Sequence, residues 1–243
     1  MKQKHLTGII LAAGFGSRLA GSSTQTRLKP LTPVAGEPLI VRTLDSLALA
    51  GCRTAVIVLG HASAEIQQSI EHIYQGPLAL EFVVNPHFEK QNGLSLMTAG
   101  TVVQDSFLLT MADHVFSDEV MQLASQHEPP PNGATLVVDY RINEIFDLDD
   151  ATKVLAGSDN RVIQIGKQIP KYNCIDTGLF IGTRAMIDEA TRLFDTFDDA
   201  SLSQVVQALA KNDCMKVLDI GTGFWQDVDT PQMLRHAESV LGR

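Results

Sequence analysis

Residues 7–19 have the sequence TGIILAAGFGSRL, an apolar stretch that runs into a turn of small residues. The apolar run predicts a buried β-strand, and the turn after it contains Gly14 and Gly16. Glycines let a ligand approach backbone N–H groups closely, and loops of this kind bind phosphate. The turn lacks the third glycine of a dinucleotide fingerprint and the Gly-Lys-Ser/Thr ending of a Walker loop. It therefore predicts a phosphate-binding loop of another kind, with a purely structural turn as the alternative.

Outward from this stretch, apolar runs of strand length alternate with longer helix-like segments. We expect strands at residues 7–13, 54–59, 80–84, 106–111 and 134–140, and helices at 38–50, 64–74, 94–103 and 117–126. This alternation predicts an α/β fold of Rossmann-like type, in which helices flank a mostly parallel sheet.

The pattern changes after residue 128. Three consecutive prolines at 129–131 indicate a loop and not a domain linker, because strand-like sequence resumes directly after them. The remaining segments are short strands at 152–155, 162–165 and 178–182, helices at 184–193 and 202–211, a strand near 215–220 and a closing helix after Pro231. We therefore expect a small β-rich extension of the sheet, and one domain over residues 1–243.

The composition excludes several classes of protein. The chain has 243 residues, with 28 acidic against 19 basic side chains and a net charge of −9. That balance does not support a basic nucleic-acid-binding surface, so we expect no nucleic-acid partner. The three cysteines form no C-x-x-C pair, which favours a reducing, cytoplasmic location. No apolar run approaches the about 20 residues that span a bilayer, so we expect no membrane insertion.

Positive charge gathers beside the glycine turn in this otherwise acidic chain. Arg18, Arg27 and Lys29 follow the turn closely. A guanidinium can bind two phosphate oxygens at once, and an ammonium neutralises charge that develops on a phosphoryl group. A solvated basic loop is the alternative interpretation.

These residues also carry a resemblance. The segment LAAGFGSRL at 11–19, followed by Lys29-Pro30-Leu31, resembles the signature of the sugar-phosphate nucleotidyltransferase superfamily. The resemblance implies a Rossmann-like fold with a nucleotide-binding half at 1–127 and an acceptor-binding half at 128–243. It implies that Arg18 and Lys29 are catalytic. It also implies nucleotide binding by Leu11, Ala12, Ala13, Gly14, Phe15, Gly16 and Ser17.

Carboxylates follow two of the expected strands. Asp113 comes directly after the apolar run 107–111, at the sheet edge where α/β proteins bind ligands. Asp227 and Asp229 are two residues apart, so on a strand they would share one face. Carboxylates together with substrate phosphates can hold Mg²⁺, which we expect as the cofactor. The sequence leaves open which of Asp227 and Asp229 is the closer ligand, and a turn at Asp113 or a helix cap at Asp229 are the structural alternatives.

Three further stretches sharpen the resemblance. They are NGLSL at 92–96, LTMADHVFS at 109–117, and ATKV at 151–154 with IGK at 165–167 and DTG at 176–178. They look like the cytidylyltransferases that activate inositol 1-phosphate, relatives of the choline-phosphate enzymes. One departure is Ala112, where that family usually has glycine. The resemblance implies CTP and a small phosphomonoester as partners. Since such enzymes often carry a fused membrane domain, we expect this chain to pass its product to a separate enzyme.

The acceptor must bring a second anion to the triphosphate, and this repulsion calls for positive charge. Lys153 and Lys167 are the candidates, with exposed lysines on a β-rich flap as the alternative. Asn92 and Ser95 could hydrogen-bond the base or ribose, although Asn92 could instead cap a helix. Asp176 is a third acceptor-binding candidate, and His114 is as compatible with a structural role as with a ligand contact.

The expected reaction is in-line attack by the acceptor phosphate on the α-phosphorus of CTP, with release of pyrophosphate. Inositol 1-phosphate is the expected acceptor. Choline phosphate, an aminoalkyl phosphonate and a sugar 1-phosphate are alternatives with the same chemistry. A nucleotide-binding module without turnover should lack the Arg, Lys or metal carboxylates, and all of these are present. The sequence does not decide between a monomer and a homodimer.

Overall fold

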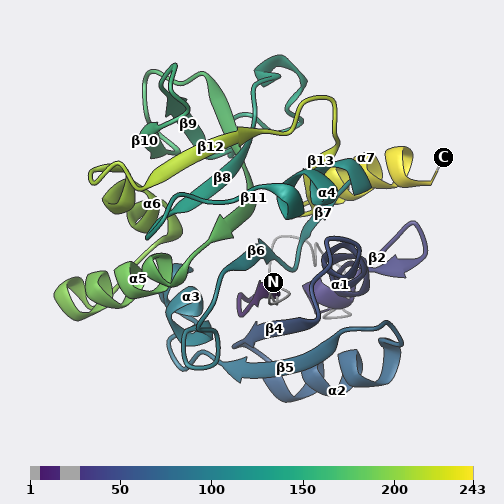
Figure 1. Ribbon diagram of the computed structural model, residues 1–243. Helices are drawn as coiled ribbons and strands as arrows, with labels where there is room; N and C mark the ends of the chain where they lie inside the picture. Colours follow the sequence, from purple (N-terminus) through teal and green to yellow (C-terminus); the bar gives the residue numbers. More distant parts are fainter. Residues whose placement is uncertain (1–5, 17–27, 243) are drawn as a thin grey trace.

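The expected first strand is β1, Thr7–Ala12, and it lies inside a mixed, mostly parallel sheet (Figure 1). The computed structural model describes residues 6–16 and 28–242. In these residues the main path of the sheet has the order β10-β9-β11-β6-β1-β4-β5, and β8 pairs with both β11 and β12. The strands added to β1 are β4 (Thr54–Leu59), β5 (Ala79–Val84), β6 (Phe107–Met111), β8 (Ala134–Asp139), β9 (Lys153–Ala156), β10 (Val162–Gly166), β11 (Cys174–Gly182) and β12 (Met215–Asp219).

The first half forms the predicted βαβ units. β1 pairs in parallel with β4 and β6, and β4 pairs in parallel with β5. The connecting helices are α1 (Leu39–Leu49), α2 (Ser63–Ile73), α3 (Gly93–Ala99) and α4 (Asp118–Gln126). The carboxyl ends of β1, β4 and β6 therefore meet at one edge of the sheet. The predicted fold class is confirmed.

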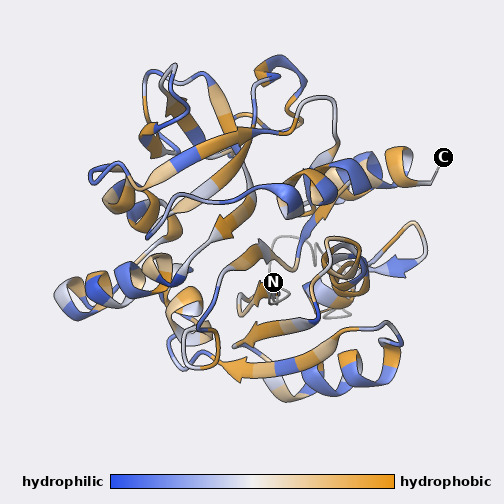
Figure 2. Cartoon of the chain, in the orientation of Figure 1, coloured by the Kyte–Doolittle hydropathy of each residue, from blue (hydrophilic) through white to orange (hydrophobic). Residues whose placement is uncertain are grey.

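Alternation along the strands gives the sheet two apolar faces. Ile9 and Leu11 of β1 belong to one buried cluster, which also contains residues of α3, α5 (Arg184–Phe197) and α6 (Leu202–Ala210). Ile10 and Ala12 belong to a second cluster with residues of α1, α2 and α4. Figure 2 shows strongly apolar central strands and helices in which apolar and polar residues alternate along the length. The sheet is thus covered on both sides.

The second half contains the expected β-rich extension. β9 and β10 form an antiparallel pair at one end of the sheet, and β11 joins this pair to β6 in antiparallel register. β11 begins at Cys174, four residues before the strand expected at 178–182. The prediction started too late because Asp176 interrupts the apolar pattern, although neither it nor the positive φ of Gly178 ends the strand.

Two helices differ in length from the prediction. α3 ends at Ala99, and the residues to 103 continue in hydrogen-bonded turns instead of the helix expected to reach 103. α5 continues to Phe197 and ends where Asp198 adopts a left-handed conformation with φ 57°. Both differences lie at helix ends, where local pairing decides the boundary.

A second, two-stranded sheet lies beside the main one. β7 (His114–Phe116) pairs with β13 (Trp225–Asp227), and the closing helix α7 (Pro231–Leu241) follows. Thr230 caps α7 by accepting a hydrogen bond from the Met233 N–H, so Asp229 is not the cap. The short elements are the 3₁₀ helices Lys29–Leu31 and Ile142–Glu144 and the strands β2 (Pro33–Val34) and β3 (Glu37–Pro38).

No helix among the described residues combines the length and the apolar character that crossing a membrane requires.

Candidate active site

The glycine turn lies between the carboxyl ends of β4 and β6 and is hydrogen-bonded to the residues that follow both strands. The Ala13 carbonyl accepts a hydrogen bond from the His61 N–H, and the Leu11 carbonyl accepts one from the Ala112 N–H. Gly16 has a φ of +64°, and a Cβ there would lie 2.6 Å from Lys29 Cβ. Glycine is therefore required at this position both by its conformation and by the close approach of Lys29.

This turn lines a cavity of about 340 Å³, which we call the loop cavity. Its walls are Leu11, Ala12, Gly14, Phe15, Gly16, Lys29, Pro30, Ala112, Asp113 and Asp229. Phe15 is 54% exposed and its ring contacts those of His61 and Phe88. Most of the residues predicted to bind nucleotide thus surround one space. Ser17 and Arg18, and also Arg27, lie outside the described residues.

Lys29 connects the turn to two carboxylates. It begins a 3₁₀ helix, and its ammonium forms ion pairs with both Asp113 and Asp229. Burial lowers the pKa of Lys29, but the two carboxylates outweigh it and raise the pKa above its ordinary value. Burial raises the pKa of Asp113, yet Lys29 and His114 hold it well below its usual range. Lys29 and Asp113 are therefore both charged at neutral pH.

His114 lies on the other side of Asp113. Its Nδ1 is 2.6 Å from Asp113 Oδ1, while Lys29 contacts Oδ2. Burial lowers the pKa of His114, but Asp113 and then Asp227 raise it above the ordinary value. His114 is thus a half-buried partner of the Asp113 carboxylate.

Asp227 is close to this group but is held differently. Its Oδ1 accepts a hydrogen bond of 2.9 Å from Gln226 Nε2, and no ion pair with Lys29 is seen in the described residues. Burial raises the pKa of Asp227, and the Asp229 and Asp113 carboxylates add to the rise against the effect of His114. Asp227 and Asp229 were expected to share one face of a strand. β13 ends at Asp227, so Asp229 lies beyond the strand and this expectation is wrong.

The carboxylates beside Lys29 can be matched to the needs of a magnesium ion. Asp113 and Asp229 converge on one cation, the Lys29 ammonium, whereas no cluster of three or more His, Cys, Asp or Glu side chains is arranged for metal binding in residues 6–16 and 28–242. Mg²⁺ commonly takes one or two carboxylates and completes its shell with water and substrate phosphate. Two convergent carboxylates therefore fit Mg²⁺ but not a metal caged by protein alone.

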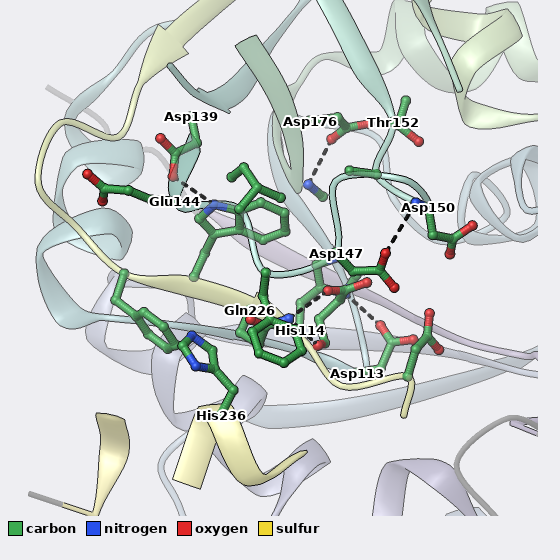
Figure 3. A pocket seen from close by; sticks show the side chains of 18 of the residues that line it. Asp113, His114, Asp139, Glu144, Asp147, Asp150, Thr152, Asp176, Gln226 and His236 are labelled. Atoms are coloured by element: carbon green, nitrogen blue, oxygen red, sulfur yellow. Dashed lines mark hydrogen bonds and ion pairs between the residues drawn. The ribbon is translucent and has the colours of Figure 1, made fainter. Parts of the chain in front are cut away.

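A second cavity of about 550 Å³ meets the loop cavity at Asp113 and Asp229, which line both. We call it the acidic cavity (Figure 3). Its walls carry eight acids, Asp113, Asp139, Glu144, Asp147, Asp150, Asp176, Asp227 and Asp229, with Arg141, Lys167, His114 and His236, and the rings of Phe146, Phe224 and Trp225.

The residues predicted to bind the acceptor are spread over this region. Lys167 and Asp176 line the acidic cavity, and Lys167 is ion-paired with Asp150. Lys153 does not line it, since its ammonium donates to the carbonyls of Leu148 and Ala151. Burial raises the pKa of Asp176 to about 6.

The two predicted base or ribose contacts are occupied within the protein. Ser95 is 5% exposed, and its hydroxyl accepts a hydrogen bond from Asn85 Nδ2. Asn92 lines the acidic cavity, but its Oδ1 accepts from the Leu202 N–H at the start of α6. Asn92 stands at the N-cap position of α3 without capping it through its side chain.

Sequence reasoning missed Asp139, Arg141 and Glu144. Asp139 ends β8, a fully buried strand, just as Asp113 follows the buried strand β6. A carboxylate at the carboxyl end of a buried strand is the signal that identified Asp113, and it would also have identified Asp139.

The chain is similar to several known proteins. Residues 8–167 match the family of the MobA-like NTP transferase domain. The bifunctional IPC transferase and DIPP synthase of Archaeoglobus fulgidus is 32% identical over 238 residues, which are 98% of this chain and 44% of that protein. The CMP-5'-(3-aminopropyl)phosphonate synthase of Streptomyces rubellomurinus is 37% identical over 115 residues, 47% of this chain and 18% of that protein.

A solved structure resembles nearly the whole chain. The inositol-1-phosphate CTP transferase from T. maritima superposes with a TM-score of 0.84 at 26% identity, covering 98% of this chain and 97% of that one. The chain spans about half the length of the bifunctional relatives it matches. Because the family match covers residues 8–167 and includes the glycine turn, Lys29 and Asp113, the chain belongs to the MobA-like NTP transferase family.

Proposed function

We propose that the chain transfers CMP from CTP to inositol 1-phosphate and releases pyrophosphate. The observation that carries the proposal is that two cavities meet at one pair of carboxylates, Asp113 and Asp229. A donor in the loop cavity and an acceptor in the acidic cavity would bring their phosphates together at this pair. The T. maritima structure, named as an inositol-1-phosphate CTP transferase, supports this choice of donor and acceptor.

The proposed reaction is a single in-line displacement. An oxygen of the acceptor phosphate forms a bond to the α-phosphorus of CTP, and the bond from that phosphorus to the bridging oxygen of pyrophosphate breaks. A phosphomonoester has its second pKa at about 6, so the attacking oxygen is already ionised and needs no general base. The protein is left with positioning and charge neutralisation.

Lys29 is the residue we assign to the α-phosphoryl group. Its ammonium is half-buried beside the loop cavity, and its raised pKa keeps it protonated throughout the neutral range. In a partly buried place, such a charge stabilises a developing negative charge more strongly than in water. Arg18 and the turn from Leu11 to Ser17 remain our proposal for the triphosphate.

Asp113 and Asp229 would hold Mg²⁺, with Asp227 beside them as a positioning residue. When bound, this ion supplies neutralisation of phosphate charge and orientation of donor and acceptor. His114 keeps Asp113 ionised and oriented through the 2.6 Å contact to its Oδ1. The protein side of the site is thus organised around the Asp113 carboxylate.

An aminoalkyl phosphonate is the second candidate acceptor. The relative from Streptomyces rubellomurinus is named for an aminopropylphosphonate product, and its match covers 47% of this chain. The many acids of the acidic cavity would also suit a cationic head group. Choline phosphate and a sugar 1-phosphate complete the panel, and a nucleotide-binding module without turnover is disfavoured because Lys29, Asp113 and Asp229 are all in place.

The test is a pyrophosphate-release assay with Mg²⁺, four nucleoside triphosphates and a panel of these acceptors. We expect CTP with inositol 1-phosphate to give the highest kcat/KM. Preference for another acceptor with CTP would change the substrate but keep the reaction, whereas no release from any pair would favour the binding module.

A further inference from the structure

The wall of the acidic cavity contains the guanidinium of Arg141, whose orientation is fixed by hydrogen bonds to Asp139 and to the Gly223 carbonyl. Arg141 donates from Nε to Asp139 Oδ1 at 3.0 Å and from Nη2 to Asp139 Oδ2 at 2.8 Å. Nη2 also donates to the Gly223 carbonyl at 2.6 Å. Asp139 is 3% exposed, while the Arg141 side chain is 31% exposed and lines the cavity.

The same carboxylate also holds an aromatic ring of the cavity wall. Trp225 Nε1 donates to Asp139 Oδ2 at 3.1 Å, and the Arg141 N–H donates to Oδ1 at 2.8 Å. Asp139 therefore accepts four hydrogen bonds and binds Arg141 and Trp225 into one rigid unit. Two-point contact between carboxylate and guanidinium fixes direction as well as distance.

Arg141 and Glu144 both line the cavity, and the long ion pair between them leaves hydrogen-bonding capacity on each. The bonds to Asp139 and Gly223 use Nε and Nη2, which leaves the Nη1 donors of Arg141. Glu144 Oε2 lies 3.8 Å from Nη1, beyond hydrogen-bond distance, and Glu144 lines the same cavity. A fixed donor beside a carboxylate acceptor matches a hydroxyl group, which both donates and accepts.

Charge argues against an anionic head group here, and the hydrogen-bond donors of Arg141 argue against a cationic one. Asp139 neutralises Arg141, and Glu144 leaves the trio with a net negative charge, which disfavours a phosphate or carboxylate here. An ammonium would face the positive charge of the Arg141 guanidinium and offers no acceptor for its N–H donors. An aromatic cage is also incomplete, because the rings of Phe146 and His236 stack on each other with centroids 4.7 Å apart.

We propose that Arg141 is a specificity-determining residue that binds a hydroxyl of a polyol head group on the acceptor, and that Asp139 is its positioning residue. This inference rests on the proposed function, and it selects a neutral polyol phosphate over a cationic acceptor. The phosphate of the acceptor is directed to the other end of the cavity, at Asp113 and Asp229.

The experiment uses the purified chain with Mg²⁺ and CTP, and compares inositol 1-phosphate with choline phosphate. Arg141→Gln keeps a similar volume and removes the charged donor, and Asp139→Asn presents an amide to the donors of Arg141 and Trp225. Arg192→Gln is the matched control, since Arg192 pairs with Glu189 on the outside of α5. Thermal melts and circular dichroism establish that each variant is folded.

For Arg141→Gln we expect the KM for inositol 1-phosphate to rise about 10-fold or more, the loss typical of a hydrogen bond from a charged donor. The KM for CTP should stay within about twofold, as it does when only acceptor binding is lost. Asp139→Asn should also raise the acceptor KM while kcat at saturating acceptor is largely kept. The preference for inositol 1-phosphate over choline phosphate should fall in both variants.

An unchanged acceptor KM in folded Arg141→Gln would overturn the inference, and so would a wild-type preference for choline phosphate. Both of those results would leave the cytidylyltransferase proposal intact. No pyrophosphate release from CTP with any acceptor would overturn the proposed function and this inference with it.

Discussion

The ammonium of Lys29 is ion-paired with the carboxylate of Asp113, although the two residues are 84 positions apart in the chain. The same ammonium contacts Asp229, 200 positions after it. This pairing brings together the glycine turn, the end of β6 and the segment before α7. The site therefore depends on one small cluster of charges, and each member can be tested separately.

Replacing Lys29 with methionine should separate catalysis from cation binding. We expect kcat to fall about 100-fold or more, the loss seen when one charge-stabilising donor is removed. Because the ammonium no longer competes for Asp113 and Asp229, Mn²⁺ should bind the variant more tightly than the wild type when nucleotide is left out. Titration followed by electron paramagnetic resonance measures this binding, with Lys211→Met as a surface control. Weaker Mn²⁺ binding in Lys29→Met would contradict the shared use of the two carboxylates.

The two acids near the C-terminus should differ in importance. Asp229 contacts the central ammonium, whereas Asp227 bonds to Gln226. Asp229→Asn should lower kcat/KM about 100-fold, as expected for a ligand or charge partner at the reacting centre. Asp227→Asn should lower it about 10-fold or less, as for a residue that orients ligands. Steady-state kinetics over a range of Mg²⁺ concentrations will rank them, and the reverse order would assign the metal to Asp227.

Gly60 directly follows β4 and packs closely against the glycine turn. A Cβ at this position would lie 2.7 Å from the Ala13 carbonyl oxygen and would also collide with Phe88. Gly60→Ala should therefore displace the turn and raise the KM for CTP about 10-fold, because small misplacements of a binding group are costly. The acceptor KM should change little. Gly51→Asn is the control, since no atom lies within 4 Å of a Cβ there and asparagine tolerates its positive φ. Equal effects of the two substitutions on CTP binding would argue against this role.

Asp176 should make stability depend on pH. Its folded-state pKa is raised from 3.8 to about 6 by burial, so the folded chain binds the proton more tightly than the unfolded chain. The stability contributed by this group is therefore present at low pH and is lost as the pH rises from 3.8 to about 6. Asp176→Asn should stabilise the protein above pH 6 by up to about 3 kcal/mol and have little effect near pH 4. Urea unfolding at pH 4 and pH 8 measures both, and a larger gain at pH 4 would show that the sign is wrong.

The sequence was sufficient to predict the fold class and the grouping of the glycine turn, Lys29 and Asp113. Continuous apolar runs, separated by helix-like segments, predicted β1, β4 and β6, and parallel strands necessarily bring the glycine turn and Asp113 to one edge. Lys29 belongs to the same prediction, because it follows the turn closely in the chain. These relationships depend on periodicity and strand direction, which are local properties of the sequence.

The positions of other side chains near the site depend on tertiary contacts, which the sequence pattern does not reveal. Lys153 was expected at the acceptor phosphate, but the turn at 147–151 presents carbonyls that bind its ammonium. Ser95 faces Asn85 because α3 packs against β5 and β4, so its hydroxyl is inside the protein. Asp139 and Arg141 are only two residues apart, yet the cavity wall that they form also needs Trp225, which comes from a strand distant in sequence.

The central claim is that donor and acceptor meet at Asp113 and Asp229. It is tested most directly by following CTP, inositol 1-phosphate and Mg²⁺ with ³¹P nuclear magnetic resonance, in wild type and in Asp113→Asn. We predict equimolar pyrophosphate and CDP-inositol from the wild type, and neither product from a folded Asp113→Asn variant. Equal product formation by the two proteins would contradict the claim.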